Sequence, residues 1–265
     1  TAETDANGNF TISFLAEADQ SISRKADPTF TFSVEASITD VNGETQSGNT
    51  SISVGYRSID IALNAGDGID RSEADSLDLS VQDLNGNTLD VPLNVRITQL
   101  QVPATPLRDR VLEQPDRHIL SKAEFKERFP QDAYADENDP ITWPKKSVVM
   151  ARKQWLAKGR SLALSGISKW EVGSYLIEAS AVDAQGDTVR VQKVVAVYDP
   201  VGPRSGFDND AFHVEAVKAK VEPGEKAVLL VSSALPEAYV LMEVERNGAI
   251  TRRQWITLKD EQQRV

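Results

Sequence analysis

Apolar and polar residues alternate with a period of two through most of this chain. The alternation is clearest at 30–38 and 89–97, where each Phe, Val, Ile or Leu is followed by a smaller or polar residue, and it recurs with one interruption at 175–182. Such a period is typical of antiparallel strands that bury one face. Shorter runs of the same kind lie at 10–14, 52–56, 59–63, 77–81, 162–164, 189–198, 212–214, 227–231, 239–245 and 250–258. We therefore predict a mainly β fold of tandem, Ig-like antiparallel β-sandwich domains.

One part of the pattern occurs twice. The segment 32–45, FSVEASITDVNGET, recurs as 175–188, YLIEASAVDAQGDT, with six of fourteen aligned positions identical. A separation of 143 residues is too long for a solenoid unit and has the size of a whole domain. We interpret the two segments as the same hairpin in two successive domains.

An Asp-x-[Asn/Gln]-Gly motif stands beside such runs four times, beginning at Asp5, Asp40, Asp83 and Asp183. A calcium loop of the EF-hand type would need further oxygen ligands at fixed spacing and a terminal bidentate Glu, which these motifs lack. An aspartate that caps a turn and a glycine with positive φ fit the position between strands. We interpret all four motifs as turns.

The positions of the runs predict three parts. Residues 1–57 have three strands, too few for a sandwich, and we interpret them as the C-terminal part of a β-domain. Residues 58–200 form a complete sandwich, with an insertion at about 102–160. Residues 201–265 comprise a linker, 201–210, and the start of a further domain. Pro92 interrupts one run and predicts an edge or bulged strand there. The opening TAETDANG predicts a piece of a longer protein.

The predicted insertion contains one helix and a group of aromatic residues. Ser121 and Glu124 have the spacing of a capping box, and Pro130 ends the helix after Phe129. The aromatic residues could hold the insertion on its own sandwich or offer a docking surface to a neighbouring domain or partner. They are Phe125, Phe129, Tyr134 and Trp143.

The composition of the chain excludes several kinds of partner and catalytic site. The 265 residues carry 40 acidic and 29 basic side chains, a net charge of -11, which argues against nucleic acid as a partner. There is no Cys for thiol catalysis or Cys-type zinc sites. The two histidines, His118 and His213, have no serine elbow or HExxH motif beside them. The simplest interpretation of the acidic segments 67–73 and 132–139 is that they are solvated loops, and the alternative is that either binds a divalent cation. We identify no catalytic, cofactor-binding or metal residue and expect no enzyme.

Four motifs together resemble a known family. They are T-D-x-x-G-x-F at 4–10, the repeated hairpin, E-F-K-x-x-F-P-x-D-x-Y-x-x-E at 124–137 and E-P-G-E at 222–225. In this order and spacing they resemble the tandem macroglobulin domains of bacterial alpha-2-macroglobulin-like proteins. The resemblance implies an extracytoplasmic protein, in the periplasm, cell envelope or medium, that inhibits proteases by entrapment after cleavage of a bait segment. The thioester of some members needs a Cys, which this chain lacks, and we find no bait segment.

We therefore expect a non-catalytic scaffold fragment of a bacterial alpha-2-macroglobulin-like protease inhibitor. Its expected partners are neighbouring domains of the same protein and, through the full-length protein, target proteases. No nucleic acid, direct membrane contact or cofactor is expected. Two alternatives remain open: a surface adhesin or glycan-binding β-sandwich array, and the accessory β-domains of a larger enzyme.

Overall fold

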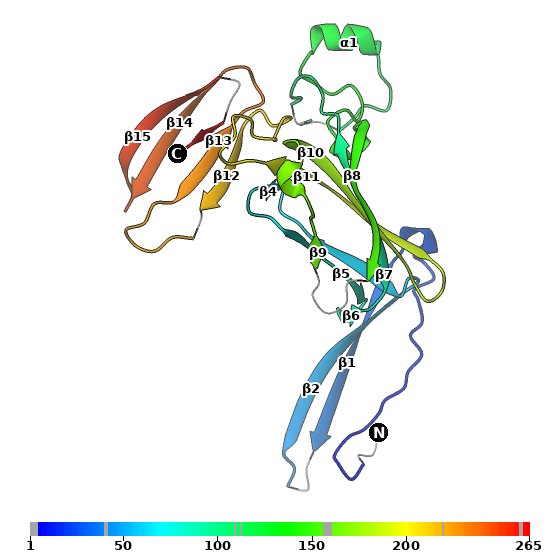
Figure 1. Ribbon diagram of the computed structural model, residues 1–265. Coiled ribbons are helices and arrows are strands. Elements are labelled where there is room, and N and C mark those ends of the chain that lie inside the picture. Colours follow the sequence, from blue (N-terminus) through cyan, green and yellow to red (C-terminus); the bar gives the residue numbers. More distant parts are fainter. Residues whose placement is uncertain are drawn as a thin grey trace.

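The computed structural model describes residues 5–39, 42–108, 110–111, 113–155, 161–218, 220–259 and 262–265, with only the backbone of Trp155. The chain is mainly β and forms several antiparallel sheets, which confirms the predicted fold class. An N-terminal hairpin, a middle sandwich and a pair of C-terminal sheets follow one another along the chain (Figure 1).

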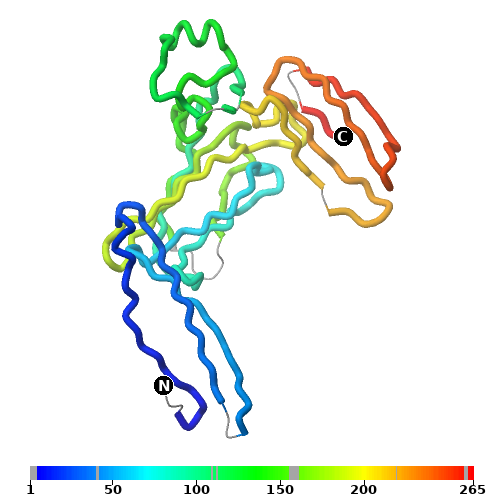
Figure 2. Tube along the Cα trace, turned by 180° about the vertical axis from the view of Figure 1, so that it is seen from behind, coloured from blue at the N-terminus to red at the C-terminus, as the bar shows by residue number. Residues whose placement is uncertain are grey.

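The N-terminal hairpin consists of β1 (Thr29–Thr39) and β2 (Thr45–Gly55), preceded by a 3₁₀ turn at Arg24–Ala26. The strand predicted at 10–14 is wrong, since that segment is in no described strand. It is extended and runs beside the hairpin (Figure 2), with the Phe14 ring 5.6 Å from that of Phe32. Alternation of apolar and polar residues therefore does not by itself guarantee a hydrogen-bonded strand partner.

The middle sandwich has two sheets around one core. The first has the order β4-β11-β10-β7-β8, and all its pairs are antiparallel except β4 with β11. In the second sheet, β5 pairs with β3, β6 and β9. The strands are β3 (Ile59–Asn64), β4 (Gly68–Asp70), β5 (Ser76–Asp83), β6 (Thr88–Leu89), β7 (Pro92–Leu100), β8 (Lys145–Trp155), β9 (Ser161–Ala163), β10 (Gly173–Val182) and β11 (Thr188–Tyr198).

The period of two decides which side chains enter this core. Leu93, Val95 and Ile97 on β7 are buried, whereas Asn94 and Arg96 between them are exposed. The other large core side chains with no exposed area include Leu79, Leu162, Tyr175 and Val197. The burial of each such side chain stabilises the fold by about 1.5–3 kcal/mol. The cluster in this sandwich is the largest apolar core among the described residues.

The two repeated hairpins have the same register. β1–β2 closes at the pair Thr39–Thr45 and β10–β11 closes at Val182–Thr188, which are the same positions of the repeat. The turn glycines Gly43 and Gly186 have φ of 85° and 89°. Asp40 lies outside the described residues, so its predicted role stays untested.

The turn interpretation holds for the other three motifs. In each, the aspartate Oδ1 accepts hydrogen bonds from the backbone N–H groups two and four residues later, at 2.8–3.0 Å. The glycine N–H donates to the aspartate carbonyl. The aspartates are Asp5, Asp83 and Asp183, and the glycines have positive φ.

Two predictions about β7 and its neighbour are wrong. β7 begins at Pro92 and lies between β10 and β8, so it is neither an edge strand nor bulged at the proline; the first position of a strand tolerates a missing N–H. The insertion is also shorter than 102–160, because β8 begins at Lys145. Irregularities in the β7–β8 register, between Ile97 and Thr98 and between Gln99 and Leu100, mask the period of two along β8.

The irregular segment before β8 carries the predicted helix, α1 (Lys122–Arg128). Both bonds of the capping box are present: the Glu124 N–H donates to Ser121 Oγ, and the Ser121 N–H donates to the Glu124 carboxylate. A 3₁₀ turn at Pro140–Thr142 then leads into β8, and another follows β9 at Ile167–Lys169. Within the described residues no helix is long and apolar enough to cross a membrane.

The C-terminal part has two packed sheets. One contains β12 (His213–Lys218), β13 (Val228–Ser232) and β16 (Gln263–Arg264), and the other is the hairpin of β14 (Ala238–Arg246) and β15 (Ala249–Leu258). Val231, Ile256 and Leu258 form the buried cluster between them. The predicted strands at 227–231, 239–245 and 250–258 are thus present.

The turn glycines allow a direct test. Gly186→Ala places a Cβ on a residue with φ of 89°, and we expect a loss of about 1–2 kcal/mol in the free energy of unfolding. Gly66→Ala is the matched control in the same sandwich, because Gly66 has no positive φ and an added Cβ meets only backbone at 3.5 Å or more. We expect the control to stay within about 0.5 kcal/mol. Urea unfolding followed by tryptophan fluorescence measures both, and equal effects would contradict the turn geometry.

Candidate functional site

The outer face of the five-stranded sheet, the face turned away from the sandwich core, has three zones along β10 and β11. At one end Ala196 and Tyr198 contact Phe207 and Leu230, which follow the sandwich in sequence. In the middle, Leu176 and Leu100 contact Trp143 of the irregular segment. The remaining zone carries polar and charged side chains of β7, β8, β10 and β11. Two zones are therefore contact surfaces within the chain, and the third is open to solvent.

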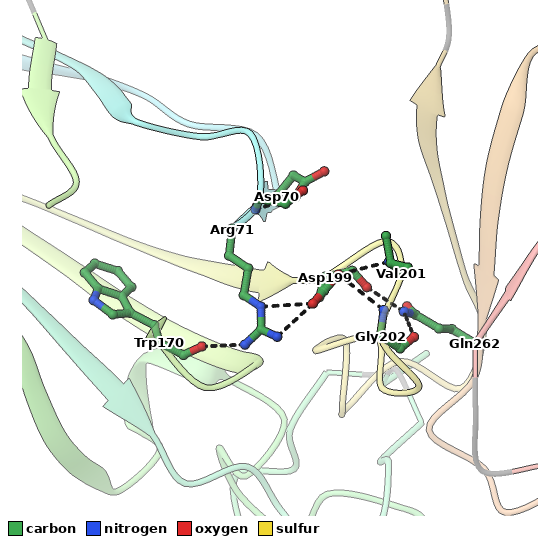
Figure 3. A network of polar contacts seen from close by, with 8 residues as sticks. Asp70, Arg71, Trp170, Asp199, Val201, Gly202 and Gln262 are labelled. Atoms are coloured by element: carbon green, nitrogen blue, oxygen red, sulfur yellow. Dashed lines mark hydrogen bonds and ion pairs between the residues drawn. The ribbon is translucent and has the colours of Figure 1, made fainter. Parts of the chain in front are cut away.

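A polar network surrounds the first zone (Figure 3). Arg71, which follows β4, donates to the Asp199 carboxylate from Nε at 3.3 Å and from Nη2 at 2.7 Å, and from Nη1 to the Trp170 carbonyl at 2.8 Å. The other Asp199 oxygen accepts the N–H groups of Val201 and Gly202. One carboxylate thus fixes both the end of the sandwich and the turn that leaves it.

Gln262 connects this turn to the C-terminal sheets. Its side-chain amide donates to the carbonyls of Asp199 and Gly202 at 2.6 and 2.5 Å, and its N–H donates to the Pro203 carbonyl at 3.1 Å. Gln262 directly precedes β16, which pairs with β13. The network and the apolar contacts around Phe207 form what we call the C-terminal joint.

The joint perturbs the titration of several groups. The hydrogen bonds from Arg71, followed by those from the Val201 and Gly202 N–H groups, hold the pKa of Asp199 below its usual value of 3.8. Burial raises the pKa of Tyr198 to about 12. Burial lowers the pKa of His213, but its contacts with Asp210 and Glu215 outweigh burial and raise that pKa overall.

Phe207 corrects the prediction of a simple linker at 201–210. Its ring is buried, lies 5.7 Å from that of Tyr198 and stacks on His213 at 3.5 Å between ring centroids. Gly68 lies beneath it, where an added Cβ would come within 2.9 Å of the Phe207 ring. Glycine and proline composition suggested a flexible segment, whereas one aromatic side chain anchors it.

A second joint lies at the other end of the sandwich, and it uses the motif turns. Asp183 Oδ2 accepts from the Ser58 N–H at 3.1 Å and from Ser58 Oγ at 3.3 Å. Asn85, in the turn that starts at Asp83, accepts from the Ser53 N–H and donates to the Ser53 carbonyl at 2.8 and 3.2 Å. The sequence revealed these residues as turns, but their second role depends on distant backbone that no local pattern encodes.

The predicted aromatic group divides in the structure. Phe125 contacts both Phe129 and Tyr134, with ring-centroid distances of 5.2 and 5.4 Å, and His118 stacks on Tyr134 at 4.0 Å. Trp143 is not among them: it is buried on the sheet and donates from Nε1 to the Glu137 carbonyl. Phe129 stays partly exposed, and the docking surface remains a prediction.

The acidic loops have partners within the chain. Asp67 lies near Lys193, Asp132 pairs with Arg108, and Glu137 pairs with Lys122 at 2.6 Å. Burial raises the pKa of Glu137, but hydrogen bonds from Lys122 and the Ala135 N–H outweigh it and bring that pKa down to about 2. Among the described residues no group of three or more His, Asp or Glu side chains is placed to hold a metal ion.

Comparison with known proteins finds a distant structural match but no family or curated relative. No known protein-family profile and no curated protein matches the chain. Among solved structures it is similar to the crystal structure of a tetra-tandem repeat in the extending region of a large adhesion protein, with 14% identity and a TM-score of 0.29. The alignment covers 100% of this chain and 56% of that one. A likeness this distant carries no argument about function.

The C-terminal joint can be tested through Asp199. Asp199→Asn keeps the shape but leaves Arg71 without a charged acceptor, and we expect a loss of about 1–2 kcal/mol in the free energy of unfolding at pH 7. Because the pKa of Asp199 is lowered in the folded state, this contribution is complete above its usual value of 3.8 and disappears as the pH falls through the folded pKa. The difference between variant and wild type should therefore shrink in acid.

Glu243→Gln is the control for that measurement, because the Glu243–Arg253 pair is exposed on the β14–β15 hairpin. We expect it to change the free energy of unfolding by less than about 0.5 kcal/mol. Urea unfolding between neutral pH and pH 3 compares the two variants. An Asp199→Asn effect as small as the control, or one that grows in acid, would contradict the proposed role of this carboxylate.

Proposed function

We propose that this chain is a non-catalytic scaffold segment of an extracytoplasmic array of β-sandwich domains, and that the array serves as a surface adhesin or glycan-binding protein. The observation that carries the scaffold function is the C-terminal joint. Arg71, Asp199 and Gln262 link three parts of the chain through five side-chain hydrogen bonds at 2.5–3.3 Å. The chain would act by holding its neighbours in fixed positions.

The physics of the joints supports this function. A Gly- or Pro-rich linker lets two domains reorient freely, and small polar interfaces permit relative motion. Here the segment after β11 has a buried aromatic anchor, Phe207, and the turn around Gly202 is hydrogen-bonded on both sides. At the other end, Asp183 and Asn85 bind backbone of the preceding segment. A force or displacement at one end would thus pass through the middle sandwich.

The open zone of the outer sheet face favours the adhesin over the other array functions. Its side chains are polar and charged, and they stay accessible while the rest of that face contacts other parts of the chain. An adhesin needs an accessible recognition surface on a rigid support. The middle sandwich combines both features.

A macroglobulin-like protease trap is the second candidate. The matching register of the two hairpins supports it, because those hairpins carry much of the resemblance to that family. In a trap, the same joints would control how far the domains close around a protease.

The full-length protein distinguishes the two functions. With a protease added, an adhesin should keep its radius of gyration in small-angle X-ray scattering and release the protease on gel filtration. It should also bind a polysaccharide or host protein saturably. Compaction with a retained protease would overturn the adhesin and support the trap.

A further inference from the structure

The open zone has a definite arrangement of groups, which we call the cationic face. Residues of four adjacent strands line it, and they border a cavity of about 540 Å³ that is open to solvent. This volume is within the range of small-molecule binding sites. The four strands are β8, β7, β10 and β11, which lie side by side in the five-stranded sheet (Figure 1). The polar side chains of this face are Asn94, Arg96, Lys153, Glu178, Ser180, Arg190 and Gln192.

Strand register places these groups in two rows. Lys153 pairs with Asn94, Asn94 with Ser180 and Ser180 with Arg190, so one residue from each strand stands in line. Beside this row, Arg96, Glu178 and Gln192 form the second. With strands about 4.8 Å apart, the first row spans roughly 14 Å. The arrangement suits an elongated ligand that crosses the strands.

The charge of this face is opposite to that of the chain. Three cations, Arg96, Lys153 and Arg190, and one carboxylate, Glu178, belong to this face, whereas the whole chain has a net charge of -11. Lys153 and Arg190 stand at opposite ends of the first row, with Asn94 and Ser180 between them, and Arg96 lies opposite Glu178, whose pKa it helps to lower. Because the accessible cations of this face outnumber its carboxylates, the face attracts anions.

The single carboxylate is held in a fixed position. Lys145 Nζ donates to both oxygens of Glu178 at 2.8 and 2.9 Å, and Gln192 Nε2 donates to one of them at 3.0 Å. A carboxylate fixed among cations remains an acceptor for a neutral donor such as a hydroxyl group. The face therefore offers cations for negative groups and, at its centre, an acceptor for hydroxyl groups.

We propose that the cationic face binds an acidic polysaccharide that carries uronic acid residues. Arg96, Arg190 and Lys153 would contact the sugar carboxylates, since guanidinium groups bind carboxylates through paired hydrogen bonds. Glu178 in the second row would accept from sugar hydroxyls, and Asn94 and Ser180 in the first row would offer amide and hydroxyl groups to the sugar. This inference rests on the adhesin function proposed above, whose ligand class it names.

Other polyanions fit the face less well. Protein partners are usually held by Trp, Tyr or Arg anchors in well-packed, desolvated pockets, whereas this cavity is open to solvent, and single-stranded nucleic acids are held by stacking of bases on aromatic rings. No Phe, Tyr or Trp is among the residues that line this cavity. Amide, hydroxyl and guanidinium groups predominate instead.

Isothermal titration of the chain with oligogalacturonate and oligomannuronate tests the proposal. The triple variant Arg96→Glu, Lys153→Glu, Arg190→Glu should weaken binding at least tenfold, and binding to wild type should weaken as salt increases. The matched control is Lys169→Glu, Lys220→Glu, Lys226→Glu, which makes the same charge change at exposed positions away from this face. We expect it to change affinity less than threefold. Circular dichroism confirms that both variants fold.

Two further ligands separate sugar recognition from charge. Fully methyl-esterified oligogalacturonate keeps the sugar without the carboxylates, and poly-L-glutamate keeps carboxylates without the sugar. Both should bind at least tenfold more weakly than oligogalacturonate. No uronate binding by wild type, equal weakening by both triple variants, or equal binding of polyglutamate would overturn the proposal. If the array binds another polysaccharide and the face variant binds it equally well, the adhesin function stands and this site is wrong.

Discussion

The five-stranded sheet of the middle sandwich has to bury one face completely and the other only in part. On the inner face, Leu93, Ile97, Tyr175 and Val197 are removed from water together with the opposing sheet. On the outer face, the same strands are apolar at one end and polar at the other. β10 shows the change within a few residues, from buried Leu176 to partly exposed Glu178 and Ser180. The positions of the C-terminal sheets and of the irregular segment around α1 depend on which residues cover the apolar end.

Two segments meet that requirement. Trp143 covers Leu100 and Leu176, and Phe207 with Leu230 covers Ala196 and Tyr198. Once these contacts form, the C-terminal sheets and the irregular segment around α1 have fixed places on the sandwich. The polar network around Asp199 then gives the Arg71 guanidinium and the carbonyls of Trp170 and Gly202 hydrogen-bonding partners, as most buried polar groups require. The C-terminal joint is thus a consequence of a sheet with an apolar outer end.

The same constraint leaves the recognition surface we propose. Side chains on the uncovered end of the outer face must be soluble, but solubility alone does not require cations to gather there in an acidic chain. Acidic residues elsewhere in the structure have partners, such as Asp132 with Arg108 and Glu137 with Lys122. A rigid support and an accessible charged face are the two features that an array for adhesion needs.

Much of this fold could be predicted from the sequence, because interactions between residues close in sequence determine it. The period of two located most strands, the Asp-x-x-Gly motifs gave their turns, and Ser121 with Glu124 gave the start of α1. Each depends on residues within a few positions of one another. The errors have a different origin: residues 10–14 alternate but find no strand partner, and β8 was missed because shifts in its register to β7 break the period.

The sequence by itself determined the fold class, the turns, the helix and the repeated hairpin, because backbone preferences and the burial of one face act locally. Tertiary structure decided what those elements do. Asp183 and Asn85 bind segments far away in sequence, Phe207 turns an apparent linker into an anchor, and strand pairing aligns Lys153 with Arg190 across four strands. Such relations arise from register and from which surface covers which, and no local pattern carries that information.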